Sequence, residues 1–403
     1  MSRSVLIATS STLSAGGIGS FCALLCESLS DQGYEPIVVA PPVAVGKSWS
    51  EYGARATYVV GAEVDPENGF RQIDEIINRH QCMGILNNDH PYLQAYAPIS
   101  HVPLVSICHF ESGAIGRMAT ENAPFVDYIV AISEDMRSAI AASKLVAENQ
   151  VKLVHTGIAV DGLSKPRSPI CRTRTLFLGG GDRRKGADLV ERLAVRLAES
   201  GHTAPIEWYG HLSQHQRKRL SKLQSVRLMG HQSRNNVLSA LLEARYLLFP
   251  SRAEGCPMAL LEAMGMGVVP ICAAGRGAMR EIVSDKLNGF IVPLGDWVSN
   301  AQDQLQRKFS DELWGVMSNA AQDRVLNHFS IDQKADELVS LLRLARVRRP
   351  VGYQARAIYW HRSPRRPFPL GLVDSLRFRY GIIKRGAVVL SQRSPQGDQQ
   401  NQA

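Results

Sequence analysis

The chain has 403 residues, a length that predicts two or three domains. Hydrophobic residues make up 45% of it and charged residues 21%, a balance that excludes a wholly disordered or collagen-like chain. The 46 Lys and Arg exceed the 37 Asp and Glu, for a formal net charge of +9. No apolar run approaches ~20 residues, so we expect no membrane-spanning helix.

The N-terminus and the cysteines indicate a reducing compartment. Residues 4–9 are an apolar run that predicts a strand and is too short for a signal peptide. The seven cysteines are odd in number, scattered and without a C-x-x-C pair, a pattern typical of buried thiols. We therefore expect a cytoplasmic protein.

Apolar runs alternate with helical patterns through the first 160 residues. The predicted strands are residues 4–9, 36–40, 83–87, 103–107, 127–133 and 151–156. Such alternation is typical of a parallel sheet covered by helices on both faces. Residues 161–173 are rich in Pro, Ser and basic residues, and we predict that they form a linker.

The alternation restarts after this linker. The predicted strands of the second set are residues 175–180, 206–210, 226–230, 245–250, 268–273 and 289–293. Helical segments follow to residue 344. We therefore predict an α/β protein with doubly wound domains at 1–160 and 174–344, the second including the closing helices. A ligand cleft is expected between them, at the carboxyl ends of the strands.

The segment 250–271 has the clearest functional pattern. Its loop contains Glu254 and Gly255, and Pro257 occupies a predicted first helical position. The start of this helix would face the mouth of the sheet, where its free N–H groups suit an anion. Glu262 follows Glu254 by eight residues, and carboxylates suit paired sugar hydroxyls. The alternative interpretation is a helix-dipole glutamate and a solvated one.

This segment resembles the E-x7-E motif of retaining glycosyltransferases with the GT-B fold, most closely family 4. Other segments resemble the same family in the expected order, namely residues 16–40, 127–140, 154–161 and 277–293. The resemblance implies two Rossmann-like doubly wound domains that face a central cleft. It also implies an acceptor-side N-terminal domain and a nucleotide-sugar-binding C-terminal domain.

The resemblance assigns roles within the motif. Glu262 would hold the ribose hydroxyls of a nucleotide-sugar. Glu254 would face the donor sugar and phosphate together with the backbone of Gly255, Cys256 and Pro257.

Further roles follow from the same resemblance. Lys185, assisted by Arg184, would neutralise the diphosphate leaving group, as a fixed cation does in a transition state. His109 would lie near the donor sugar, and Gly17 would let the backbone approach phosphate or acceptor. The alternatives are a solvated lysine at position 185 and a packed polar histidine at position 109.

The function expected from the resemblance is retaining sugar transfer from a UDP- or GDP-sugar to a hydroxyl acceptor, without a metal or other cofactor. The sequence contains no D-x-D pair and no zinc-ligand spacing. A dinucleotide fingerprint is incomplete, because Cys22 replaces its third glycine. Two alternatives remain: a nucleotide-sugar epimerase or hydrolase of the same fold, and an inactive scaffold subunit.

The C-terminal tail, residues 345–403, lies in the most basic part of the chain. Thirteen Lys and Arg lie between Arg343 and Arg393, interleaved with aromatic residues, against one acid in that stretch, Asp374. Such a stretch suits an anionic membrane surface, so we expect a peripheral protein at the inner face with a lipid-linked or glycan acceptor. Nucleic acid is not expected as a partner. The alternatives are a free tail and one packed on the acidic body.

Overall fold

The computed structural model describes most of the chain up to residue 345. The described residues are 3–13, 16–41, 48–60, 66–109, 120, 122–143, 146–161, 163, 172–202, 204–307 and 310–345. The predicted tail from residue 346 onward lies outside them. Among the helices of the described part, none is long and apolar enough to cross a membrane.

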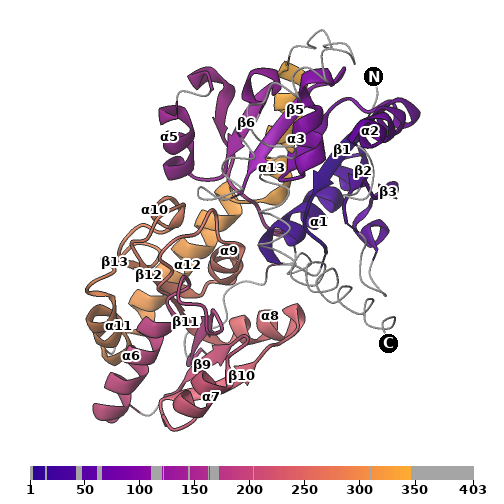
Figure 1. Cartoon of the computed structure of the whole chain (residues 1–403). Coiled ribbons are helices and arrows are strands. Elements are labelled where there is room, and N and C mark those ends of the chain that lie inside the picture. The colour runs from indigo at the N-terminus through magenta and orange to yellow at the C-terminus, as the bar shows by residue number, and fades with distance from the viewer. Residues whose placement is uncertain are drawn as a thin grey trace, which may run out of the picture.

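The N-terminal domain contains a parallel sheet in the strand order β3-β2-β1-β4-β5-β6-β7 (Figure 1). The strands are β1 Ser4–Thr9, β2 Glu35–Val39, β3 Ala56–Tyr58, β4 Ile85–Asn88, β5 Leu104–Cys108, β6 Tyr128–Ala131 and β7 Val151–Leu153. The α-helices described between them are α1 Gly16–Asp31, α2 Pro66–His80, α3 Pro91–Tyr96 and α5 Glu134–Ala142. All of β1 is buried, as expected for a strand covered on both faces.

The C-terminal domain contains a second parallel sheet, in the order β10-β9-β8-β11-β12-β13. Its strands are β8 Arg174–Leu178, β9 Ile206–Tyr209, β10 Val226–Gly230, β11 Ala244–Phe249, β12 Val269–Ala273 and β13 Phe290–Val292. The helices that follow these strands are α6 Ala187–Glu199, α7 Gln214–Leu220, α8 Arg234–Leu242, α9 Met258–Gly265, α10 Met279–Ile282, α11 Trp297–Gln306, α12 Asp311–His328 and α13 Ile331–Leu344. The predicted fold of two doubly wound α/β domains is confirmed.

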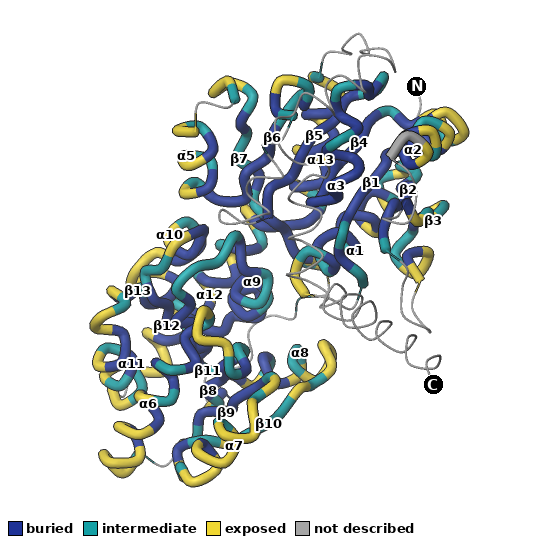
Figure 2. Tube along the Cα trace, in the orientation of Figure 1, coloured by how far each residue is buried: buried dark blue, intermediate teal, exposed yellow. Residues whose placement is uncertain are grey.

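Burial follows this layering. The central strands are buried, whereas exposed residues gather on the outer faces of the helices and at loops (Figure 2). The short strand β3 was not predicted, because its three residues are only partly buried and offer no apolar run.

Serine side chains cap the N-termini of several helices. Ser133 accepts a hydrogen bond from the backbone N–H of Met136 at the start of α5, and Ser233 accepts one from Asn236 at the start of α8. Each cap satisfies one N–H group that the helix leaves free. Both helices therefore begin at defined positions at the carboxyl edges of their sheets.

The last helix corrects one predicted boundary. We expected all closing helices within 174–344 to belong to the C-terminal domain, but α13 packs against α1 and β5 of the N-terminal domain (Figure 1). The hydroxyl of Ser28 on α1 donates to the carboxylate of Asp332 on α13. The apolar stripe of α13 was visible in the sequence, but such a stripe does not specify which sheet it covers.

We expect α13 to contribute to the stability of the N-terminal domain. Leu338 is 1% exposed and Leu344 is 68% exposed. Leu338→Ala should lower the free energy of unfolding by about 2–4 kcal/mol, because the substitution leaves a cavity. Leu344→Ala should change it by less than about 0.5 kcal/mol. Urea denaturation measures both, and equal midpoints would contradict this packing.

Candidate functional site

The loop after β11 holds Glu254 in a defined position. The hydroxyl of Ser251 donates to Oε1 of Glu254 at 3.0 Å, and the backbone N–H of Glu254 donates to the carbonyl of Arg276 at 3.1 Å. The side chain of Glu254 is 12% exposed. The carboxylate therefore lies at the carboxyl edge of the sheet, largely shielded from solvent.

Two cations from the loop before α6 flank this carboxylate. Nη1 of Arg184 lies 3.4 Å from Oε2 of Glu254, and Nζ of Lys185 lies 3.8 Å from Oε1. Arg184 also donates to the carbonyl of Ala253 at 2.9 Å. The structure thus brings together three of the predicted residues, and a second carboxylate, that of Asp182, lies 3.6 Å from Nη2 of Arg184.

The motif helix α9 begins one residue later than predicted. Pro257 is its N-cap rather than its first helical residue, and the carbonyl of Pro257 accepts from the N–H groups of Leu260 and Leu261. The first N–H groups of α9 therefore belong to Met258 and Ala259. They lie next to the loop that holds Glu254.

Glu262 projects from the middle of α9 toward α8. Its carboxylate accepts hydrogen bonds from the guanidinium of Arg234, the first residue of α8. Sequence analysis did not identify Arg234, which carries no motif of its own. Arg234 is the partner of Glu262 because α8 packs beside α9 in the fold.

The predicted histidine belongs to the opposite domain. His109 follows β5 and is 6% exposed; its Nε2–H donates to Oδ1 of Asn88 at 2.9 Å. Nδ2 of Asn88 donates to the carbonyl of Leu86, an arrangement that orients the amide. Sequence analysis missed Asn88, although an asparagine that ends a buried strand is a pattern that would have indicated it.

His109 meets the motif across the domain boundary. A Cβ atom on Gly255 would lie 2.6 Å from the carbonyl oxygen of His109, a distance that real Cβ atoms do not reach. Glycine is therefore required there for the two domains to approach. The hydroxyl of Thr156 donates to the carbonyl of Cys256 at 3.0 Å beside this contact.

Cys256 and Gly17 are placed less directly for ligand contact. Burial raises the pKa of the Cys256 thiol to about 11, so this side chain is a neutral part of the interface between the domains. Gly17 is an exposed residue at the start of α1, with open space where a side chain would be. Its predicted contact with phosphate or acceptor remains a prediction.

A carboxylate not assigned a role in sequence analysis links the two domains. Oε1 of Glu281 accepts from the backbone N–H of Glu134 at 2.8 Å, and Oε2 accepts from Nε2 of His155 at 2.7 Å. Asp135 in turn accepts from the backbone N–H of Gly277 at 2.7 Å. Each domain thus supplies a carboxylate that accepts a backbone N–H group of the other domain: Asp135 from the N-terminal domain and Glu281 from the C-terminal domain.

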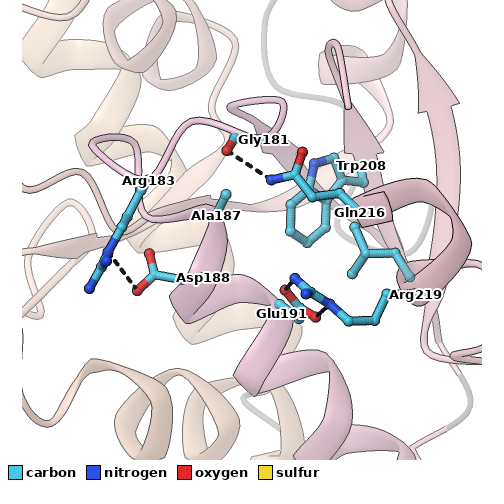
Figure 3. A pocket seen from close by; sticks show the side chains of 9 residues that line it. Gly181, Arg183, Ala187, Asp188, Glu191, Trp208, Gln216 and Arg219 are labelled. Atoms are coloured by element: carbon cyan, nitrogen blue, oxygen red, sulfur yellow. Dashed lines mark hydrogen bonds and ion pairs between the residues drawn. The ribbon is translucent and has the colours of Figure 1, made fainter. Parts of the chain in front are cut away.

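A small cavity is lined in part by Gly181 and Arg183 of the 179–186 loop. It has a volume of about 160 Å³ and is bounded by residues of α6, β9 and α7, as Figure 3 shows. Its charged side chains are already paired: Arg219 with Glu191, and Arg183 with Asp188 at 3.9 Å. The cavity therefore lies next to the Glu254 cluster without sharing its cations.

Comparison with known proteins finds a family match in the second domain. Residues 172–311 match the family described as Glycosyl transferases group 1. The match lies within the second domain and does not extend to the first. The matched region contains every predicted site residue except Gly17 and His109.

The wider comparisons concern fold and a shorter stretch of sequence. A glycosyltransferase from Rickettsia africae has 14% identity and a TM-score of 0.70, covering 85% of this chain and 98% of its own. HepE from Anabaena, solved in complex with UDP-glucose, has 15% identity and a TM-score of 0.68, covering 84% and 99%. These similarities show the GT-B fold.

One curated relative is an Escherichia coli protein, UDP-Gal:alpha-D-GlcNAc-diphosphoundecaprenol alpha-1,3-galactosyltransferase. It is 27% identical over 108 residues. The matched stretch spans 27% of this chain and 27% of the relative's length.

We expect Glu281 to hold the two domains together. Glu281→Ala leaves the N–H of Glu134 and the imidazole of His155 without their acceptor. The free energy that holds the two domains together should fall by about 1–3 kcal/mol. Small-angle X-ray scattering should then show a larger radius of gyration. Glu312→Ala, at an exposed position of α12, is the matched control. Identical scattering from the two variants would contradict this role.

Proposed function

We propose that the protein transfers a sugar from a nucleoside-diphosphate sugar to a hydroxyl acceptor, with retention of configuration at the anomeric carbon. The observation that carries the proposal is the cluster of Arg184, Lys185 and Glu254 at the carboxyl edge of the C-terminal sheet. Glu262 lies about one helical turn into the adjoining helix α9. The spacing suits a diphosphate beside the cations and a ribose beside Glu262.

The chemistry follows from the charges. When the bond between the anomeric carbon and the β-phosphate oxygen breaks, negative charge grows on the diphosphate. Lys185 and Arg184 stabilise this charge, which lowers the barrier to bond cleavage. The acceptor oxygen bonds to the anomeric carbon on the face that the diphosphate leaves. Its proton passes to an oxygen of the departing phosphate.

Glu254 and His109 would border the sugar in this arrangement. The carboxylate of Glu254 would accept from sugar hydroxyls while the two cations stay beside it. His109 is held by Asn88 and lies against Gly255, so it would form the N-terminal wall of the donor site. No step in this scheme is assigned to a metal, and metal independence is part of the proposal.

A UDP-sugar is the proposed donor, and a lipid-linked or other glycan the proposed acceptor. The Escherichia coli relative is named for UDP-Gal and a diphosphoundecaprenol-linked sugar, and HepE was solved with UDP-glucose. The low identities leave the sugar to be found by experiment. Thermal-shift measurement with UDP-, GDP- and ADP-sugars tests the donor, because a specific ligand raises Tm.

Lys185→Ala should lower kcat by roughly 10²–10³, the effect of removing a group that stabilises charge in the transition state. Glu254→Gln should also lower kcat more than it weakens donor binding. The rate of nucleotide release in the presence of a lipid-linked acceptor measures the activity of both variants. Lys222→Ala, at an exposed position away from this loop, should retain the wild-type rate.

The same assay separates the rival functions. Release that requires an acceptor supports transfer, whereas consumption of donor alone indicates an epimerase or hydrolase. Donor binding without either product indicates an inactive scaffold. Equal rates for Lys185→Ala and wild type would remove Lys185 from the site.

We further propose that the basic tail holds the protein at an anionic membrane. Each Lys or Arg near such a surface contributes on the order of 1 kcal/mol, and the attraction weakens as salt screens it. The full chain should therefore co-sediment with phosphatidylglycerol vesicles at low salt and detach as salt rises. A chain ending at Ala345 should stay in the supernatant while it keeps donor binding. Equal sedimentation of the two chains would contradict the proposal.

A further inference from the structure

Arg234 makes a one-sided contact with Glu262. Nη2 and Nε of its guanidinium lie 2.6 and 3.2 Å from the same oxygen, Oε1 of Glu262. Among the described residues, Oε2 has no hydrogen-bond partner. The carboxylate thus has one occupied oxygen and one that remains available to a ligand.

The position of Arg234 is not explained by helix stability. It is the first residue of α8, where the helix dipole disfavours a cation. Its side chain is 55% exposed, and ion pairs with so exposed a partner contribute little to folding. The two effects are small and opposite in sign. Arg234 therefore adds little to the stability of the domain.

The contact has a clear effect on Glu262 itself. The glutamate side chain is 16% exposed and has three rotatable bonds, so without a partner its carboxylate would occupy several orientations. A guanidinium that donates two N–H groups to Oε1 holds that oxygen in place and so restricts the rotation of the carboxylate. The free oxygen, Oε2, then has a defined direction.

We propose that Arg234 is a positioning residue that orients Glu262, so that Oε2 accepts a hydrogen bond from a ribose hydroxyl of the bound nucleotide. This inference rests on the proposed function, because it requires a nucleoside diphosphate beside α9. Arg234 acts through Glu262 and takes no part in bond cleavage. Its contribution is affinity for the ribose, not the rate of the chemical step.

The test compares two probes, UDP and 2′,3′-dideoxy-UDP, by isothermal titration calorimetry on the full chain. Wild type should bind UDP at least tenfold more tightly than the dideoxy compound, the ratio expected when hydrogen bonds to a charged group are lost. Arg234→Ala should reduce this ratio to about threefold or less and leave dideoxy-UDP affinity unchanged. That unchanged affinity also shows that the variant is folded.

Further variants separate positioning from a general effect of charge. Arg234→Lys should recover part of the ratio, because lysine supplies the charge without the planar fork. Combining Arg234→Ala with Glu262→Gln should lower the ratio no further than Glu262→Gln alone, since both act through one carboxylate. Arg217→Ala, at an exposed position of α7, removes the same charge and should retain the wild-type ratio.

The outcomes distinguish this inference from the proposed function. If wild type binds none of UDP, GDP and ADP, the proposed function is wrong and the inference falls with it. If Glu262→Gln loses the preference for UDP while Arg234→Ala retains it, Arg234 does not position the carboxylate and the function stands. Equal affinity of wild type for the two probes would also overturn the inference.

Discussion

Two backbone hydrogen bonds join the segments by which the chain passes between its domains. The N–H of Ile158 donates to the carbonyl of Phe329, and the N–H of Ile331 donates to the carbonyl of Ile158, both at 2.9 Å. The first segment leaves the N-terminal sheet, and the second leads α13 back to it. The chain passes between the domains twice, and the two passing segments are hydrogen-bonded side by side. We call this pair of segments the joint between the domains. The close approach of His109 to Gly255 is a second contact between the same two domains.

The site assembled beside this joint uses charge in two different ways. Around Glu254, two cations lie beside the carboxylate, one of them also paired with Asp182, and in the proposed function these cations meet a diphosphate. Around Glu262, one cation and one carboxylate are balanced, and in the proposed function the pair directs an oxygen toward a neutral ribose. Both arrangements lie at the carboxyl edge of one parallel sheet, where successive loops meet although their residues are far apart in sequence. The fold thus brings the two proposed contacts, one for a diphosphate and one for a ribose, to the same edge of the sheet.

The sequence predicted the elements of this molecule better than their contacts. Buried strands such as β1 were predicted because an unbroken apolar run suits a strand covered on both faces. Glu254 and Glu262 were predicted from the spacing of one motif, and Lys185 was predicted from the family resemblance. The partner Arg234 was not, because a hydrogen bond between distant segments leaves no local pattern, and the one local sign of Asn88 is its place at the end of a buried strand. The placement of α13 was missed for a related reason. The apolar stripe of an amphipathic helix shows that one face is buried, but it does not show which domain that face packs against.

The joint between the domains also limits what position 157 can hold. A Cβ atom on Gly157 would lie 2.7 Å from the Cα of Ile331 and 2.8 Å from its backbone nitrogen. Backbone atoms have no rotamer by which to move aside, so even an alanine methyl would act as a wedge between the two crossings. A displacement at a joint between domains grows with distance from it, and Lys185 and Arg234 both belong to the C-terminal domain. One methyl group at position 157 would therefore shift the proposed donor site although its own residues are all intact.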